Sequence, residues 1–190
     1  MYRIGLDLSI NSTGIVILDE NLKTFERWVV VSSSSSTKKV RELIDPRINI
    51  VIYEKLPTNG DTYAEKEYSK TINIHRAACE IDQILSPYKY STGEAFIEGI
   101  SYGSVGSAAL ADLAGLNFVV RCNLIKQHIP FTIVSPMANK KNACGIGNAN
   151  KDVMIAAWQK CEPETVGLEK LLKVDDIADA YFLARTPVNL

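Results

Sequence analysis

Four acidic residues set into three apolar segments constrain this chain more than any other feature of its sequence. They are Asp7 in YRIGLDLSI, Glu98 in AFIEGI, and Asp176 and Asp179 in VDDIADAYFLA. An ionised carboxylate in an apolar core is very costly unless a partner compensates its charge. The fold must therefore bring each of these side chains to a compensating group, and a shared cation is the simplest one.

Period-two alternation assigns the first two carboxylates to strand faces. Asp7 shares a face with Gly5 and Ser9, two small neighbours that leave room for a ligand. Glu98 shares a face with Phe96, where an unpaired carboxylate is expensive to bury. Plainer interpretations exist, since Asp7 can be an edge or turn residue and Glu98 can pair with a buried Lys or Arg. The combination in chain order, rather than either residue alone, indicates a site.

The third segment is predicted to be a helix, on which residues three apart share a face. Asp176 and Asp179 can therefore point at one spot. Asp175 and Asp176 also lie at the expected helix start, where acidic side chains cap free amides and suit the helix dipole. A purely structural role stays open for either of them, and the spacing to Asp179 favours Asp176 as the ligand.

The types of residue present favour magnesium over zinc. Carboxylate oxygens suit a hard cation such as Mg²⁺, and Mn²⁺ accepts the same ligands. The chain has only two histidines, His75 and His128, and they lie in unrelated segments. Two ions held by four carboxylates can activate a water and stabilise a leaving oxygen at a phosphodiester. The cluster thus points towards nuclease or phosphoryl-transfer chemistry.

Length and composition are compatible with one α/β domain. With 190 residues and 46% hydrophobic content, the chain can bury one substantial core, and we expect a single domain over residues 1–190. The cysteines are too widely spaced for a zinc knuckle or a disulfide framework: Cys79, Cys122, Cys144 and Cys161. We find no signal peptide or long apolar span and expect a soluble, cytoplasmic protein with no membrane partner.

A net charge of -1 gives no global signature of nucleic-acid binding, so DNA contacts must come from local basic patches. One is KKNACGIGNANKD, in which Lys140 and Lys141 precede a glycine turn and Lys151 begins a predicted helix. It lacks the ending of a Walker A loop, and an ordinary turn before a capped helix is the alternative. A second basic group, Lys38 and Lys39, follows a serine run that predicts a flexible loop.

Hydrophobic periodicity predicts the order of the elements. We expect strands over 2–9, 13–19, 26–31, 94–100 and 131–134, a further apolar run at 48–53, and helices over 61–86, 105–128, 150–161 and 174–186. The first three strands are joined by tight turns, which indicates an antiparallel start. Strands that then alternate with helices indicate an α/β layered domain.

The segments IGLDLSINSTGIVI, FIEGISYGSVGSAALADLAG, GIGNANK and DDIADAYFLA, in this order, resemble the RuvC-type Holliday junction resolvases of the RNase H-like nuclease superfamily. The resemblance spans most of the chain and is strongest from residue 94 onwards. It implies an RNase H-like fold, a mixed five-stranded sheet with three antiparallel strands followed by parallel ones and flanked by helices. It also implies a symmetric homodimer, formed through the helix around 105–124, that cuts two opposed strands of a four-way junction.

The resemblance implies roles for individual residues. The metal-binding carboxylates are Asp7, Glu98, Asp176 and Asp179, and Lys140 and Lys151 lie near the scissile phosphate. The chain departs from the family between Asp7 and Glu98, where an insertion is expected around 37–60 and Glu54 offers a rival carboxylate. Where family members place an aromatic wedge, this chain has Ser101, and Tyr102 follows.

The resulting hypothesis is a magnesium-dependent, structure-selective endodeoxyribonuclease that acts in DNA recombination and repair, in a bacterium, a virus-infected cell or an organelle. Asp7 would bridge two ions and Lys151 would offset charge on the phosphate. The expected DNA contacts are Lys140, Lys141, Lys151, Tyr102, Lys38 and Lys39. The alternatives are a broader nuclease for flaps, forks or RNA-containing hybrids, and a junction-binding scaffold that does not cut.

Overall fold

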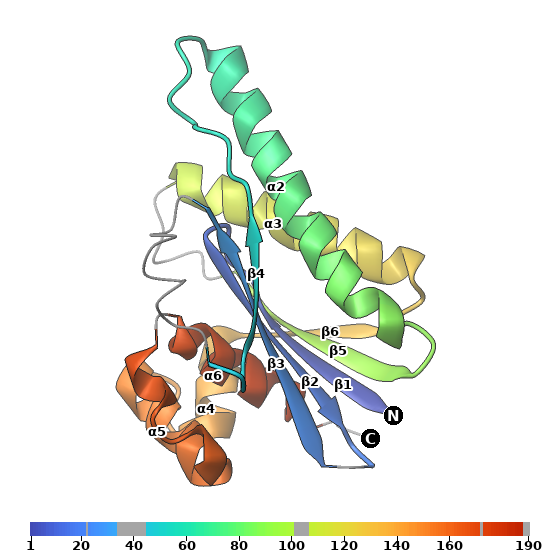
Figure 1. Ribbon diagram of the computed structural model, residues 1–190, viewed down its shortest axis with the longest axis vertical. Helices are drawn as coiled ribbons and strands as arrows, with labels where there is room; N and C mark the ends of the chain where they lie inside the picture. The colour runs from blue at the N-terminus through green and yellow to red at the C-terminus, as the bar shows by residue number, and fades with distance from the viewer. Residues whose placement is uncertain (22, 34–44, 101–106, 172, 188–190) are drawn as a thin grey trace.

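The chain folds as a six-stranded mixed sheet with helices on both faces in the computed structural model, which describes residues 1–21, 23–33, 45–100, 107–171 and 173–187 (Figure 1). The strands are β1 (Tyr2–Asp7), β2 (Ser12–Asp19), β3 (Thr24–Ser32), β4 (Asn49–Tyr53), β5 (Thr92–Glu98) and β6 (Phe131–Val134). The α-helices are α2 (Tyr63–Leu85), α3 (Ser107–Lys126), α4 (Pro136–Cys144), α5 (Lys151–Cys161) and α6 (Val174–Ala184). Short 3₁₀ helices lie at Ser86–Tyr88, Pro163–Thr165 and Leu168–Lys170.

The strand order is β4-β3-β2-β1-β5-β6, and the first three strands of the chain are antiparallel neighbours. β5 pairs in parallel with β1, and β6 pairs in parallel with β5. The expected α/β fold with antiparallel and then parallel strands is confirmed. The strand number is corrected from five to six, because β4 adds a parallel strand to β3 from the pair Trp28 and Asn49 to the pair Ser32 and Tyr53.

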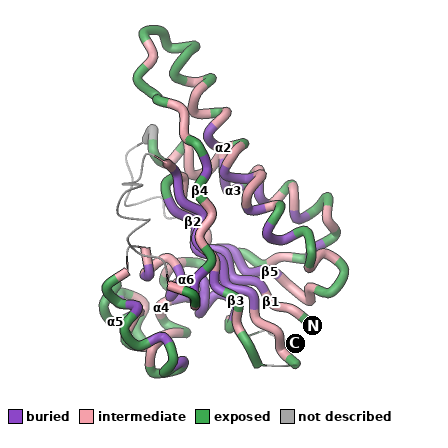
Figure 2. Tube along the Cα trace, in the orientation of Figure 1, coloured by how far each residue is buried: buried purple, intermediate pink, exposed green. Residues whose placement is uncertain are grey.

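The two faces of the sheet carry two separate cores. On one face α2 and α3 cover strand residues such as Ile4, Leu6 and Ile15, which are fully buried. On the other face α5 and α6 pack against Val16 and Val29. Buried residues run through the central strands in Figure 2. The predicted alternation along β1 is thus confirmed, and Asp7 faces the α6 side of the sheet.

α4 is an element that the glycine-turn interpretation of this region missed. Ser135 is its N-cap and accepts a hydrogen bond from the Ala138 amide at 3.2 Å, and Pro136 occupies the first turn. Gly145 ends the helix in a left-handed conformation, with φ 78°. The turn that we predicted therefore begins only after a nine-residue helix, and this helix carries Lys140.

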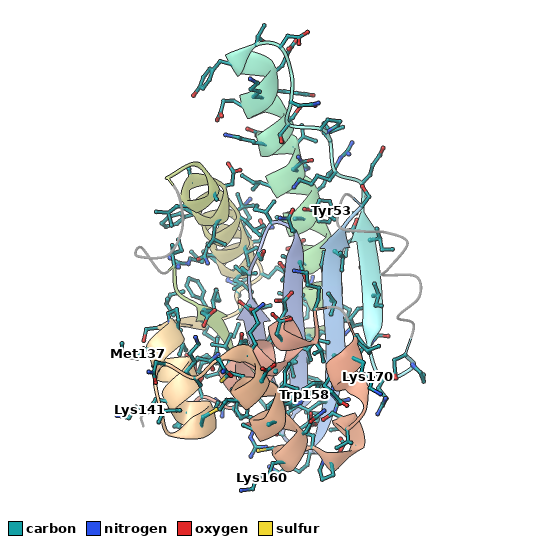
Figure 3. All side chains as sticks on the ribbon, turned by 90° about the vertical axis from the view of Figure 1, so that its left-hand side faces the viewer. Tyr53, Met137, Lys141, Trp158, Lys160 and Lys170 are labelled. Atoms are coloured by element: carbon teal, nitrogen blue, oxygen red, sulfur yellow. The ribbon has the colours of Figure 1, made fainter. Side chains whose placement is uncertain are left out.

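α5 is anchored by a buried polar network. Trp158 is fully buried and points from α5 into the body of the molecule (Figure 3). Its indole Nε1 donates to Glu162 at 2.6 Å, and Glu162 forms an ion pair with Arg27 of β3 at 2.8 Å. Both charged side chains are almost fully buried, and each compensates the charge of the other, which would be costly to bury alone. This network fixes α5, whose first residue is Lys151, against the sheet.

α6 lies unusually close to β1 and β2. A Cβ atom on Gly5 would stand 1.9 Å from the Ala180 carbonyl oxygen, and one on Gly14 would stand 2.1 Å from the Asp176 carbonyl oxygen. No larger residue fits at either position without moving the helix. The two glycines therefore allow the backbone of α6 to rest directly on the two strands.

Gly14→Ala should force α6 away from β2 and lower the free energy of unfolding by about 3 kcal/mol, because the added methyl meets backbone rather than a flexible side chain. Urea unfolding measures the loss. Gly145→Ala is the matched control: its φ is 78° but nothing lies within 4 Å of an added Cβ, so backbone strain alone should cost about 1 kcal/mol. An equal loss in both variants would contradict the close contact of α6 with β2.

Candidate metal centre

The four acidic residues singled out in the sequence come from three elements that meet at one end of the sheet. Asp7 is the last residue of β1, and Glu98 is the last residue of the neighbouring parallel strand β5. Asp176 and Asp179 lie in the first turns of α6, which packs directly on β1 and β2. All of them are partly buried.

Asp7 and Glu98 form a coupled acidic pair. The pKa of Asp7 is raised well above its usual range, first by burial and then by the charges of Glu98, Asp176 and Asp179. A hydrogen bond joins Asp7 to Glu98, so the two carboxyl groups titrate as a pair rather than as independent groups. The pKa of Glu98 is still raised, because burial outweighs this hydrogen bond and the nearby charge of Lys140.

The two helix aspartates are perturbed in the same direction. Burial raises the pKa of Asp176 to about 6, against the effect of a hydrogen bond that it accepts from the Ser12 hydroxyl. Burial, followed by the charges of Glu98 and Asp176, raises the pKa of Asp179 to about 7, and Lys140 opposes this shift. Near neutral pH the cluster therefore keeps protons that isolated carboxyl groups would lose.

Two of the lysines expected to contact DNA lie beside the carboxylates. Lys140 on α4 is close enough to lower the pKa of both Glu98 and Asp179. Lys151, at the start of α5, forms an ion pair with Asp175, and this interaction raises the pKa of the lysine. Its side chain is 76% exposed, so the ammonium group remains accessible from solvent.

The other expected DNA contacts are not part of this cluster. Lys141 is exposed and points outward from α4 (Figure 3). Lys38, Lys39 and Tyr102 lie outside the residues that the structure describes.

The structure separates Asp175 from Asp176. Lys173 is the N-cap of α6 and makes no side-chain capping bond, so neither aspartate is the N-cap residue. Asp175 pairs with Lys151, whereas Asp176 is among the charges that raise the pKa of Asp7. The geometry thus favours Asp176, together with Asp179, over Asp175.

Glu54, the rival carboxylate, points elsewhere. Its side chain is 81% exposed and lies 3.7 Å from Arg76 of α2. The carboxyl groups that act on Asp7 are those of Glu98, Asp176 and Asp179. Glu54 is therefore explained by its surface ion pair.

The chemistry of the cluster fits an oxygen-liganding cation such as Mg²⁺. Asp179 Oδ1 is buried and has no hydrogen-bond partner among the described residues. The raised pKa of Asp7 favours its protonated form, so binding of a cation at this carboxyl group would be coupled to release of a proton. In the described ranges, no three His, Cys, Asp or Glu side chains converge closely enough to surround an ion.

Sequence reasoning missed the polar residues that support these carboxylates. Ser12 Oγ donates to Asp176, Asn117 Nδ2 donates to the Glu98 carbonyl oxygen at 3.4 Å, and Asn139 Nδ2 donates to the Asp179 carbonyl oxygen at 3.2 Å. All three donors are buried. Isolated Ser and Asn residues carry no periodic signal, and only the packing of α3, α4 and α6 on the strands reveals these contacts.

The fold is RuvC-like, as comparison with solved structures shows. No family model matches the chain, and no curated protein matches it. A Thermus thermophilus RuvC structure superposes with a TM-score of 0.58 at 15% identity, covering 97% of this chain and 91% of that one. T. thermophilus RuvC in complex with Holliday junction substrate superposes with a TM-score of 0.59 at 13% identity, covering 97% and 90%. At this identity the likeness establishes the fold.

The helices of the described residues include none that is both long enough and apolar enough to cross a membrane.

The raised carboxyl pKa values predict how stability depends on pH in the absence of divalent ions. Between the ordinary pKa of Asp and the folded values of about 6 for Asp176 and about 7 for Asp179, the folded protein binds more protons than the unfolded chain. The free energy of unfolding should therefore fall as the pH rises through this window.

Asp179→Asn should remove part of this dependence, so that its stability relative to the wild type improves by on the order of 2 to 4 kcal/mol between about pH 4 and pH 8. Urea unfolding with chelator present measures both proteins. Glu54→Gln, at the exposed rival carboxylate, is the control and should follow the wild type. Parallel pH profiles for the wild type and Asp179→Asn would contradict the raised pKa of Asp179.

Proposed function

We propose that this chain is a metal-dependent, structure-selective endodeoxyribonuclease that resolves four-way DNA junctions by paired phosphodiester hydrolysis. The observation that carries the proposal is the cluster of Asp7, Glu98, Asp176 and Asp179, in which the charges of the other carboxylates raise the pKa of Asp7 and those of Glu98 and Asp176 raise the pKa of Asp179. Such a concentration of uncompensated carboxylates is typical of functional sites rather than of structural ion pairs. The RuvC-like fold supports nuclease chemistry at this position.

The four carboxylates would hold two Mg²⁺ ions, or Mn²⁺ in their place, and the ions would supply water activation and charge stabilisation when bound. The acidic cluster repels a DNA phosphate, so the positive residues around it must help to hold the backbone. Lys151 has its ammonium group at the amino end of α5, where the helix dipole also favours a phosphate. Lys140 brings a second positive charge beside Glu98 and Asp179.

A four-way junction is the preferred substrate in this proposal because one of the similar structures is RuvC in complex with Holliday junction substrate. Cutting two opposed strands requires two active sites, and hence a symmetric homodimer. The outer face of α3 supports such a contact. Phe118 and Ile125 are 58% and 62% exposed, and the exposed Cys122 lies between them on the same face of the helix.

Asp7→Asn should abolish cleavage while leaving folding and junction binding intact, with a loss of rate of more than about 100-fold. The assay compares a labelled immobile four-way junction with linear duplex and flap DNA, in Mg²⁺ and in EDTA. Glu54→Gln is the matched carboxylate control and should cut like the wild type. Full activity in Asp7→Asn would refute the metal assignment, and equal or better cutting of flaps would move the function to a broader branched-DNA nuclease.

Replacing both Phe118 and Ile125 with Glu should convert the dimer into monomers, because charges on an apolar two-fold contact repel each other across it. Light scattering over a concentration series measures the mass with and without junction DNA. Tyr90→Glu is the control, since Tyr90 is 86% exposed and lies just before β5 rather than on α3. A wild type that stays monomeric in every condition would make paired cutting untenable.

A further inference from the structure

Two buried asparagines support the backbone of the candidate metal centre. Asn117 on α3 is 1% exposed, and Asn139 on α4 is fully buried. Each side-chain amide donates a hydrogen bond to the backbone carbonyl of a candidate ligand: Asn117 to Glu98 at 3.4 Å and Asn139 to Asp179 at 3.2 Å. Two helices that contribute no carboxylate to the cluster are thereby linked to residues that do.

Both asparagines are poorly satisfied for buried amides. In the part of the chain that the structure describes, neither Asn117 Oδ1 nor Asn139 Oδ1 has a hydrogen-bond partner. A buried acceptor without a donor costs about 1 to 3 kcal/mol, so an apolar residue of the same shape would serve stability equally well or better. Stability alone therefore does not explain an asparagine at these two positions.

Asn73 on α2 shows what a structural asparagine looks like in the same molecule. It is 1% exposed, its Oδ1 accepts from the Leu56 amide at 2.7 Å, and its Nδ2 donates to the Leu56 carbonyl at 3.0 Å. Its amide makes hydrogen bonds on both sides and fastens the segment before α2. The contrast with Asn117 and Asn139 separates a residue that stabilises the fold from residues that orient something else.

The two asparagine hydrogen bonds act on the backbone that carries Glu98 and Asp179. Glu98 ends β5, and Gly99 makes the next backbone bond, to Val134 at 2.7 Å, so the Asn117 amide fixes the peptide on which Glu98 stands. Asn139 precedes Lys140, whose charge lowers the pKa of Glu98 and Asp179. The bond from Asn139 to Asp179 therefore keeps α4, its lysine and α6 in a fixed relation.

We infer that Asn117 and Asn139 are positioning residues of the metal centre, which hold the backbones of Glu98 and Asp179 so that both carboxylates can close on ions beside Asp7. This inference rests on the proposed function, because it concerns the same site. Asn117 also links Glu98 to α3, the helix whose outer face carries the proposed dimer contact. Residues in such a supporting layer typically change metal affinity by about 10- to 100-fold when they are replaced.

The test uses Asn117→Leu and Asn139→Leu, since leucine keeps a similar branched shape but has neither amide donor nor carbonyl acceptor. Calorimetry measures Mn²⁺ binding to the full-length metal-free protein without DNA, and urea unfolding measures stability. The apparent Kd for Mn²⁺ should rise about 10- to 100-fold in each variant. The free energy of unfolding should change little, because removing the unpartnered acceptor offsets the lost hydrogen bond. Asn117→Ala and Asn139→Ala, measured alongside, guard against a folding defect specific to leucine.

Asn73→Leu is the matched control and should give the opposite pattern. It removes two satisfied hydrogen bonds to Leu56, which is not one of the candidate ligands, so stability should fall while the Kd for Mn²⁺ stays that of the wild type. An unchanged Kd in the Asn117 and Asn139 variants, or an equal rise in all three leucine variants, would overturn the inference alone. A wild-type protein that binds no Mn²⁺ would overturn the proposed function together with it.

Discussion

The contact of α6 with β1 and β2 at Gly5 and Gly14 is the constraint on which the rest of this structure depends. A Cβ atom at either glycine would stand only 1.9 and 2.1 Å from a helix carbonyl oxygen, much closer than non-bonded atoms approach. Because both positions lack side chains, α6 rests on the strands and brings Asp176 and Asp179 beside Asp7. The same contact of α6 with β1 and β2 thus shapes both the fold and the candidate site.

Bringing these carboxylates together has an electrostatic cost that the structure meets only in part. Ser12 donates to Asp176, Lys140 lowers the pKa of Glu98 and Asp179, and a hydrogen bond joins Asp7 to Glu98. Burial still leaves every one of the four carboxyl pKa values raised, and repulsion among the carboxylates adds to this for Asp7 and Asp179. A divalent cation would relieve this repulsion more completely than the protons do, which is why the proposed function assigns metal to this place.

The sixth strand, β4, also contacts the turn beside the candidate site, although we predicted no role for its segment from the sequence. The hydroxyl of the buried Tyr53 donates to the Ile10 carbonyl, and Lys55 Nζ donates to Asn11 Oδ1 at 2.7 Å. Ile10 and Asn11 belong to the turn that follows Asp7. Tyr53 at the end of β4 and Lys55 just after it therefore hold the turn next to the carboxylates. Local periodicity cannot reveal these contacts, because the segments lie more than forty residues apart in the chain.

The sequence by itself predicted the faces of β1, the candidate carboxylates, and every strand and α-helix except β4 and α4, because alternation, helical spacing and charges in apolar segments are local signals. It also contained the Ser135-Pro136 start and the Gly145 end of α4, which the glycine-turn interpretation overlooked. Only the tertiary structure paired Asp175 with Lys151, placed Glu54 in a surface ion pair, and set Asn117 and Asn139 against Glu98 and Asp179. These choices depend on which helix lies on which strand, and that is fixed by close packing between residues far apart in the chain.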